Sequence, residues 1–296
     1  HCPPGYILFM YLSTEQRVFA SLNRPLYIPK VRSILEKGSG ETNEDVLLEA
    51  GNLFGVFDGA TSLDGSHFQG GLTGGLLAAR TAAASFQGNG YSLDQLAKEA
   101  NQRIQRMQIN NNVDLHERHK LWSTSLAVVR LAGDRLEYCQ TGDALIVFVL
   151  KDSTYRVITP DIDIDRETLQ SWKEAQVASD ANIQEIMAKQ IRKVRSEMNI
   201  SYGVLNGEPE ALDFIRHGYE ELSDVSDILL FTDGLHIPRE NPMVEHDWQC
   251  FVELYGQGGL QAVRDYVRHL QQQDLDCRKY PRFKTHDDIA AVSISC

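Results

Sequence analysis

Cysteine is scarce in this chain of 296 residues. The five cysteines are odd in number, widely separated and without a CxxC pair: Cys2, Cys139, Cys250, Cys277 and Cys296. Such a set suits neither a disulfide framework nor a zinc site built from cysteine. We therefore expect a chain that works in a reducing, cytoplasmic compartment.

Long hydrophobic runs are also missing. Near the N-terminus the longest covers residues 6–12, and no run approaches the roughly 18 residues of a membrane-spanning helix. No basic leader with a small-residue cleavage site stands out. We expect no membrane span.

Basic residues are outnumbered: 29 Lys and Arg face 41 Asp and Glu, so the formal net charge is −12. A nucleic-acid backbone and an anionic membrane both attract a basic protein surface. We expect neither to be a partner of this chain. The charge says little about small ligands.

A linker rich in proline, glycine or serine is absent as well, so nothing divides the chain into separate domains. The length suffices for one domain with a substantial core. We expect this domain over residues 31–296, with a flap-like insertion at about residues 161–217. Residues 1–30 show no clear periodicity and are assigned to an N-terminal arm of undecided role. We expect a monomer.

Apolar runs predict seven strands. They cover residues 46–48, 53–57, 124–131, 135–140, 145–150, 228–231 and 289–294. Very short links join the three strands between 124 and 150, one of them Gly133-Asp134. These three strands are therefore predicted to form an antiparallel meander.

Amphipathic spacing predicts four helices. Ser66 with Gln69 makes a capping box for a helix that reaches residue 86, and Ser92 with Gln95 makes another for a helix that reaches residue 107. The pattern returns over residues 183–198 and 260–270. Strands that come in runs, with helices grouped between them, indicate an α+β fold of packed layers.

Four glycines fall inside the first predicted helix: Gly70, Gly71, Gly74 and Gly75. Glycine lowers helix stability, so we expect these residues to permit a close approach to a neighbouring sheet.

Acidic residues stand at the ends of five predicted strands. They are Glu44-Asp45, Asp58, Asp143, Asp233 and Asp287-Asp288. Asp and Gly are common in turns, which is the simplest explanation for any one of these positions. Their repetition favours a functional explanation, because packed strands can hold several such side chains rigidly at one place.

Clustered carboxylates repel one another and are tolerated only when protons or cations neutralise them. Aspartate oxygens without accompanying His or Cys select hard cations such as magnesium, manganese or calcium. Two such ions can lower the pKa of a bridging water and clamp a phosphoryl group. The pattern therefore indicates hydrolysis of a phosphate ester.

Five short motifs, in order, resemble the PP2C-type (PPM) metal-dependent serine/threonine phosphatase family, in its bacterial-type form. They are Asn43-Glu44-Asp45, Val56-Phe57-Asp58-Gly59, Thr141-Gly142-Asp143, Phe231-Thr232-Asp233-Gly234 and Asp287-Asp288-Ile289. The resemblance implies an α-β-β-α four-layer sandwich with two central antiparallel sheets. It also implies a phosphorylated protein or peptide as substrate.

The same resemblance implies a site for two Mn²⁺ or Mg²⁺ ions, and for a third in some members. Its ligands would be Asp45, Asp58, the carbonyl of Gly59, Asp233, Asp287, Glu44 through water, and Asp143 at the third ion. Asp58 would bridge the two ions, and with Asp45 and Asp233 it is a catalytic candidate. Asp288 stands where the family usually has asparagine, so Asp287 is the preferred ligand of the pair.

Two departures from the family pattern bear on catalysis. In many relatives the substrate phosphate is bound by an arginine that lies four residues before the glutamate. In this chain that position is Gly40. Lys37 and Arg32 are the candidates to replace it. Some relatives have a histidine directly after Asp-Gly as general acid, whereas this chain has Ala60, as expected for a bacterial-type member.

Two alternative functions stay open. The missing arginine and histidine would suit a pseudophosphatase that acts as a binding or regulatory module. A phosphatase of small phosphate esters would use the same acids. The basic stretch at residues 189–195 is either the solvated face of a helix or part of a flap that meets the substrate.

Overall fold

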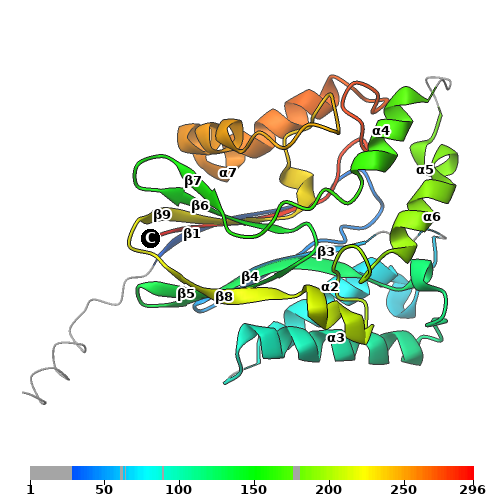
Figure 1. The fold of residues 1–296 in the computed structure, drawn as a ribbon, viewed down its shortest axis with the longest axis horizontal. Helices are drawn as coiled ribbons and strands as arrows, with labels where there is room; N and C mark the ends of the chain where they lie inside the picture. The colour runs from blue at the N-terminus through cyan, green and yellow to red at the C-terminus, as the bar shows by residue number, and fades with distance from the viewer. Residues whose placement is uncertain (1–28, 61–62, 64, 89, 176–180) are drawn as a thin grey trace, which may run out of the picture. The chain divides into compact units, whose positions relative to one another are not determined.

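A computed structural model of the chain describes residues 29–60, 63, 65–88, 90–175 and 181–296. The compact unit runs from Val31 to Cys296. Two five-stranded antiparallel sheets lie face to face, and helices cover their outer sides (Figure 1). This is the predicted α+β sandwich of four layers. The predicted N-terminal arm lies outside the described residues up to position 28 and stays a prediction.

The first sheet has the strand order β1, β10, β9, β6, β7. The strands are β1 (Lys30–Glu36), β10 (Ile289–Ser295), β9 (Val225–Phe231), β6 (Leu145–Leu150) and β7 (Tyr155–Val157). The second sheet has the order β2, β3, β4, β5, β8. Its strands are β2 (Val46–Ala50), β3 (Leu53–Gly59), β4 (Thr124–Ala132), β5 (Arg135–Thr141) and β8 (Arg216–Glu221).

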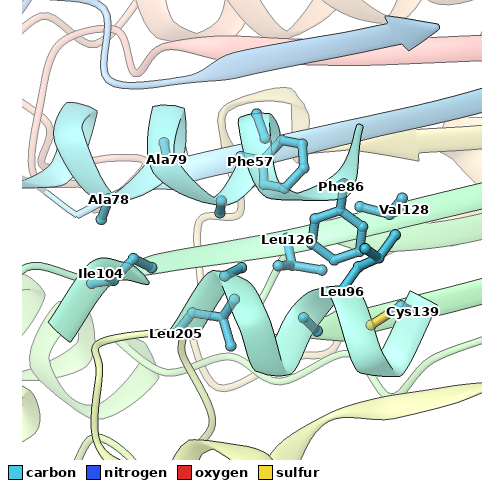
Figure 2. Packing of buried hydrophobic residues seen from close by; sticks show 14 of the residues in the cluster. Phe57, Ala78, Ala79, Phe86, Leu96, Ile104, Leu126, Val128, Cys139 and Leu205 are labelled. Carbon is cyan, nitrogen blue, oxygen red and sulfur yellow. The ribbon is translucent and has the colours of Figure 1, made fainter. Parts of the chain in front are cut away.

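Strand β3 shows how alternating side chains build two cores at once. Phe54 and Val56 belong to the cluster between the sheets, whereas Leu53 and Phe57 belong to the cluster beneath the helices. Figure 2 shows Phe57 near Phe86 of the covering helix, with ring centroids 5.7 Å apart. Because both faces are apolar, the strand is held rigidly up to the point where Asp58 begins.

Helices α2 (Gly74–Phe86) and α3 (Leu93–Asn110) cover the second sheet, and α7 (Trp248–Gln272) covers the first (Figure 1). Three short helices stand beside one end of the sheets: α4 (Arg166–Glu174), α5 (Ile183–Ile186) and α6 (Ala188–Ser196). Short 3₁₀ turns complete the list: η1 (Gln69–Gly71), η2 (Arg118–Lys120), η3 (Pro209–Phe214) and η4 (Asp233–Leu235). Across the described residues, no helix combines the length and apolarity needed to cross a membrane.

The predicted three-strand meander is wrong in its last step. Strands β4 and β5 form a hairpin, but β6 pairs with β9 in the other sheet. The link turns at Gly142, whose φ of +78° favours glycine. The first five side chains of β6 are all buried, and they need apolar partners on both faces. In the first sheet, one face of β6 packs in the core between the sheets and the other face packs against α7.

The capping box predicted at Ser92 and Gln95 is confirmed at the start of α3, but the one at Ser66 and Gln69 is wrong. Helix α2 begins at Gly74, and the Thr73 hydroxyl accepts the N–H of Leu76 at 3.3 Å. The backbone at residues 70 and 71 has φ of 76° and 73°, outside the right-handed helical region.

Two predicted helices and three strands also differ between sequence pattern and structure. The helix predicted over residues 183–198 is divided into α5 and α6 at Met187, whose ψ of 10° interrupts the helical geometry. The helix predicted at residues 260–270 extends back to Trp248, with a break at two glycines. Strands β1, β7 and β8 were not predicted, because short or largely polar segments lack an apolar run.

Gly59 and Gly75 bring the start of α2 against the end of β3. A Cβ atom at Gly59 would lie 2.4 Å from the carbonyl oxygen of Gly75, and one at Gly75 would lie 2.5 Å from that of Ala60. Gly74 packs in the same way against the Trp122 ring. The expected close approach is therefore confirmed for Gly74 and Gly75, but not for Gly70 and Gly71, which form a turn.

We expect Gly75→Ala to destabilise the protein by about 1–3 kcal/mol, because a Cβ there meets backbone atoms that cannot move independently. Gly256→Ala is the matched control: this helical glycine has open space around its Cβ position, so alanine should add up to about 1 kcal/mol of stability. Denaturant unfolding measures both. Equal stabilisation by the two alanines would contradict the close packing at Gly75.

Candidate active site

Antiparallel pairing brings the acid-bearing strand ends to the same end of the molecule. Val46, the first residue of β2, pairs with Phe57 near the end of β3. In the other sheet Phe231, the last residue of β9, pairs with both Leu145 and Ala291 at the starts of its neighbours. The residues just beyond these pairs are the predicted acids, so the sheets themselves gather them.

A cavity of about 210 Å³ lies at this end of the sheets. Four of the predicted acids line it: Asp58, Asp143, Asp233 and Asp287. Gly59 and Ala60 lie on the same wall. The opposite wall comes from α6 and the residues around it, including Ile191, Val194 and Met198. An acidic wall therefore faces a largely apolar one.

Repulsion between the acids perturbs their titration. Desolvation raises the pKa of Asp58 well above its ordinary value, and the charges of Asp45, Asp143 and Asp287 raise it further. Desolvation also raises the pKa of Asp233, and the neighbouring Asp58 charge adds to the effect. The pKa of Asp143 is raised by desolvation too, although the positive charge of Arg195 opposes the shift. The cluster therefore binds protons or cations more readily than isolated aspartates do.

Asp45 and Glu44 lie behind the cavity wall, and hydroxyl groups hold their carboxylates. The Thr232 hydroxyl donates to Oδ2 of Asp45 at 2.6 Å, and the Thr73 hydroxyl donates to Oε1 of Glu44 at 2.6 Å. Asp45 is only 6% exposed, and desolvation raises its pKa despite the bond from Thr232. Strand β9 and helix α2 thus both fix the Glu44-Asp45 pair.

Asp287 and Asp288 take different roles. Asp287 lines the cavity, and its Oδ1 pairs with the Nζ of Lys284 at 2.8 Å. Asp288 turns away from the cavity and accepts the backbone N–H groups of Gly38 at 2.7 Å and Glu44 at 2.9 Å. A carboxylate can hold both N–H groups at once, whereas the asparagine usual in the family has only one acceptor oxygen.

The structure places neither Lys37 nor Arg32 at the cavity. The Nζ of Lys37 donates to the carbonyl of Glu41 at 3.3 Å, and the side chain is exposed. Arg32 is also exposed and lies beside Gly259 of α7. The two cations proposed to replace the family arginine therefore do not approach the acid cluster in this structure.

Sequence patterns missed two charged residues that line the cavity: Asp165 and Lys284. Neither follows an apolar strand, so the strand-end pattern could not find them. Desolvation raises the pKa of Asp165 to about 7, and the charge of Arg195 opposes this shift. Of the basic stretch at residues 189–195, Arg192 and Arg195 line the cavity, which favours a role at the site over a purely solvated face.

The acids fit a hard divalent cation by their chemistry. Among the residues described here, no three Asp, Glu, His or Cys side chains already surround one point at ligand distance. The carboxylates repel one another, and a cation between them would relieve that repulsion. The available donors are all oxygen atoms, as Mn²⁺ and Mg²⁺ prefer. The hydroxyl of Ser123, which is 1% exposed and lines the same cavity, has no hydrogen-bond partner within the described part of the chain.

The fold and the acid cluster together define a sandwich of two sheets with a candidate centre for divalent cations at one end. The sequence profile of the protein phosphatase 2C family matches residues 37–277. The chain therefore belongs to the protein phosphatase 2C family of serine/threonine phosphatases, as its motifs predicted. No curated protein sequence matches the chain significantly.

Solved bacterial phosphatases share the fold. The catalytic domain of the serine/threonine protein phosphatase PstP, in complex with two manganese ions, has a TM-score of 0.55 at 15% identity, over 90% of this chain and 97% of that one. PstP/Ppp from Mycobacterium tuberculosis gives 0.56 at 17% identity, over 90% and 98%. Stp1 from Staphylococcus aureus gives 0.55 at 15%, over 91% and 95%. At such low identity the likeness establishes the fold alone.

The raised pKa values predict an unusual pH dependence for the protein in EDTA. A carboxyl group whose folded pKa lies above its ordinary 3.8 stabilises the fold at low pH, and this contribution is lost as the pH rises through the raised pKa. We expect Asp58→Asn to have a higher Tm than the parent at pH 8, by about 2–4 °C for each kcal/mol of repulsion removed. The difference should shrink towards pH 5.

Thermal unfolding at pH 5 and pH 8 measures this difference. Asp265→Asn is the control, because this side chain is 59% exposed on α7 and should shift Tm little at either pH. A constant Tm difference between Asp58→Asn and the parent across this range would show that Asp58 carries no excess repulsion.

Proposed function

We propose that this protein is a metal-dependent phosphatase that hydrolyses phosphoserine and phosphothreonine in proteins. The observation that carries the proposal is the gathering of Asp58, Asp143, Asp233 and Asp287 around one cavity at the end of two packed sheets. The family membership supports the same reaction class. The raised pKa values supply a physical reason for cation binding at this place.

Two Mn²⁺ or Mg²⁺ ions would be held by the residues that the motifs indicate. Asp58 would bridge them, with Asp233, Asp287 and the Gly59 carbonyl as further ligands. Asp45 would be a further ligand of the two ions, Glu44 would act through water, and Asp143 would contribute to a third ion. Such ions, when bound, lower the pKa of a bridging water and neutralise charge on the phosphoryl group.

The protein's own contribution is to hold its oxygen atoms in place. Asp58 extends from a strand that is buried on both faces, and Thr232 fixes Asp45. These groups need little rearrangement when substrate arrives, which favours catalysis by preorganised electrostatics. Ala60 offers no proton donor after Asp58-Gly59, so we propose that no histidine acid assists at this position.

Helices α4–α6 would form a flap beside the site, within the proposed insertion at residues 161–217. Its apolar side chains exclude water from one side of the cavity, which strengthens electrostatic interactions there. Arg192 and Arg195 bring positive charge to the same wall. A wall of this kind suits a phosphorylated peptide segment, with apolar contact to the chain and charge attraction to the phosphate.

We expect Mn²⁺ to activate hydrolysis of an aryl phosphate and of a phosphothreonine peptide, and EDTA to abolish both. Asp58→Asn should lower kcat/KM on the order of 100-fold or more, since a shared ligand to both ions contributes several kcal/mol. Steady-state rates with each substrate measure the effect. Asp265→Asn is the control and should retain parent activity, because it lies on the surface of α7.

Each alternative function has a distinct outcome. Activity that survives both EDTA and Asp58→Asn would eliminate the two-ion mechanism. Manganese binding in calorimetry without turnover of any phosphoester would establish the binding-module alternative instead. Turnover of small esters combined with inactivity on phosphopeptides would contradict the proposed protein substrate.

A further inference from the structure

Lys284 is a cation placed among the acids of the candidate site. Its Nζ lies 2.8 Å from Oδ1 of Asp287, and its side chain is 20% exposed. It lines the cavity of the acid cluster and also the adjoining one, which Asp143, Asp233 and Asp287 share.

The loop that carries Lys284 is held by one buried ion pair and by hydrogen bonds to its backbone. Asp274 accepts the backbone N–H groups of Lys279 at 2.9 Å and Tyr280 at 2.8 Å, and it pairs with Arg282 at 2.7 Å. Arg282 in turn donates to the carbonyl of Thr285 at 3.1 Å. Arg282 and Thr285 flank Lys284 within two residues, so its position is fixed by the fold rather than by its own ion pair alone.

The same loop is joined to the segment in which relatives carry their phosphate-binding arginine. The Ser39 N–H donates to the carbonyl of His286 at 2.8 Å, and Asp288 accepts the N–H of Gly38. A Cβ at Gly38 would lie 2.4 Å from that His286 carbonyl, so the two segments are in backbone contact. Gly40 and Lys284 therefore sit on adjoining loops at one edge of the site.

Acidic side chains outnumber basic ones in the lining of the cavity. Five aspartates line the cavity: Asp58, Asp143, Asp165, Asp233 and Asp287. Among the described lining residues, the cations are Arg192, Arg195 and Lys284. Arg195 acts on Asp143 and Asp165 at the flap side, whereas Lys284 acts on Asp58 at the sheet side. A phosphate dianion that approaches Asp58 meets Lys284 as the positive side chain of that wall.

We propose that Lys284 binds the substrate phosphate and replaces, from the adjoining loop, the arginine that Gly40 lacks. The proposal rests on the proposed phosphatase function and assigns a further residue to that reaction. With a cation bound at Asp287, the Lys284 ammonium would no longer be needed to neutralise that carboxylate, and its Nζ would donate to a phosphate oxygen. Lysine suits this role as a point charge on a flexible stem.

A purely structural role is the competing explanation. In that case Lys284 would only neutralise Asp287, and its loss would act through metal affinity or stability. The two roles separate in measurement, because a phosphate-binding residue changes phosphate affinity at saturating Mn²⁺, whereas a charge-balancing residue does not.

The experiment uses isothermal calorimetry of inorganic phosphate with the full chain at saturating Mn²⁺, alongside kinetics on an aryl phosphate. We expect Lys284→Met to weaken phosphate binding by about 10- to 100-fold and to raise KM in parallel, the range of one charged hydrogen bond. Lys284→Arg should retain most of the affinity. Lys279→Met is the control, because this neighbouring lysine is 52% exposed and outside both cavities.

A rescue variant sharpens the test. The nearest atom to a Cβ at Gly40 is the Thr42 carbonyl oxygen at 3.6 Å, so the position accepts a side chain. Gly40→Arg combined with Lys284→Met should recover part of the lost phosphate affinity. Thermal unfolding with Mn²⁺ identifies any variant that fails to fold. If Lys284→Met is such a variant, the phosphate affinity of Lys284→Arg is compared with that of the parent instead.

The outcomes separate the proposal from the proposed function. Unchanged phosphate affinity in Lys284→Met, or a loss seen only in Mn²⁺ affinity, would overturn the role of Lys284. Absence of phosphate binding by the parent would overturn it as well. A parent that binds phosphate through Lys284 but hydrolyses no ester would refute the phosphatase function and leave the binding role supported.

Discussion

Repulsion among recessed carboxylates is the constraint on which the active end of this protein depends. Asp45, Asp58 and Asp233 all have raised pKa values, first because they are desolvated and then because they face one another. Separate flexible loops would relax until such charges moved apart. Strands β3 and β9, which precede Asp58 and Asp233 or carry them, pair with neighbours on both sides and cannot relax in this way. The sandwich core therefore supplies the free energy that holds the acids together, and a cation or a proton offsets the remaining repulsion.

Polar contacts around the cluster carry this rigidity from the strands into the loops. Thr232 fixes Asp45, Thr73 fixes Glu44, and Asp288 fastens the segment before Glu44 to the start of β10. Each contact joins elements that are far apart in the sequence. The close approach of Gly59 and Gly75 adds α2 to the same assembly. The site is thus a meeting point of both sheets and one covering helix, which explains why its residues are spread over most of the chain.

Positive charge reaches this acidic end from two directions. Arg192 and Arg195 come from the flap side, and Lys284 comes from the loop before β10. The ion pair between Asp274 and Arg282 organises this loop. A substrate phosphate in this cavity would therefore lie between the acidic strand ends and these three cations.

The sequence alone determined the features that depend on local pattern. Apolar runs located the central strands, Ser92 with Gln95 marked the start of α3, and five strand-end motifs identified the family and the acids of the site. Tertiary structure decided whatever depends on contacts between distant segments. It places β5 and β6 in different sheets, and it lets Asp288 accept two backbone N–H groups. It also places Lys37 and Arg32 outside the cavity. It also brought Lys284 to the acids, because only the folded loop places a residue without any local motif beside charges that are distant in the sequence.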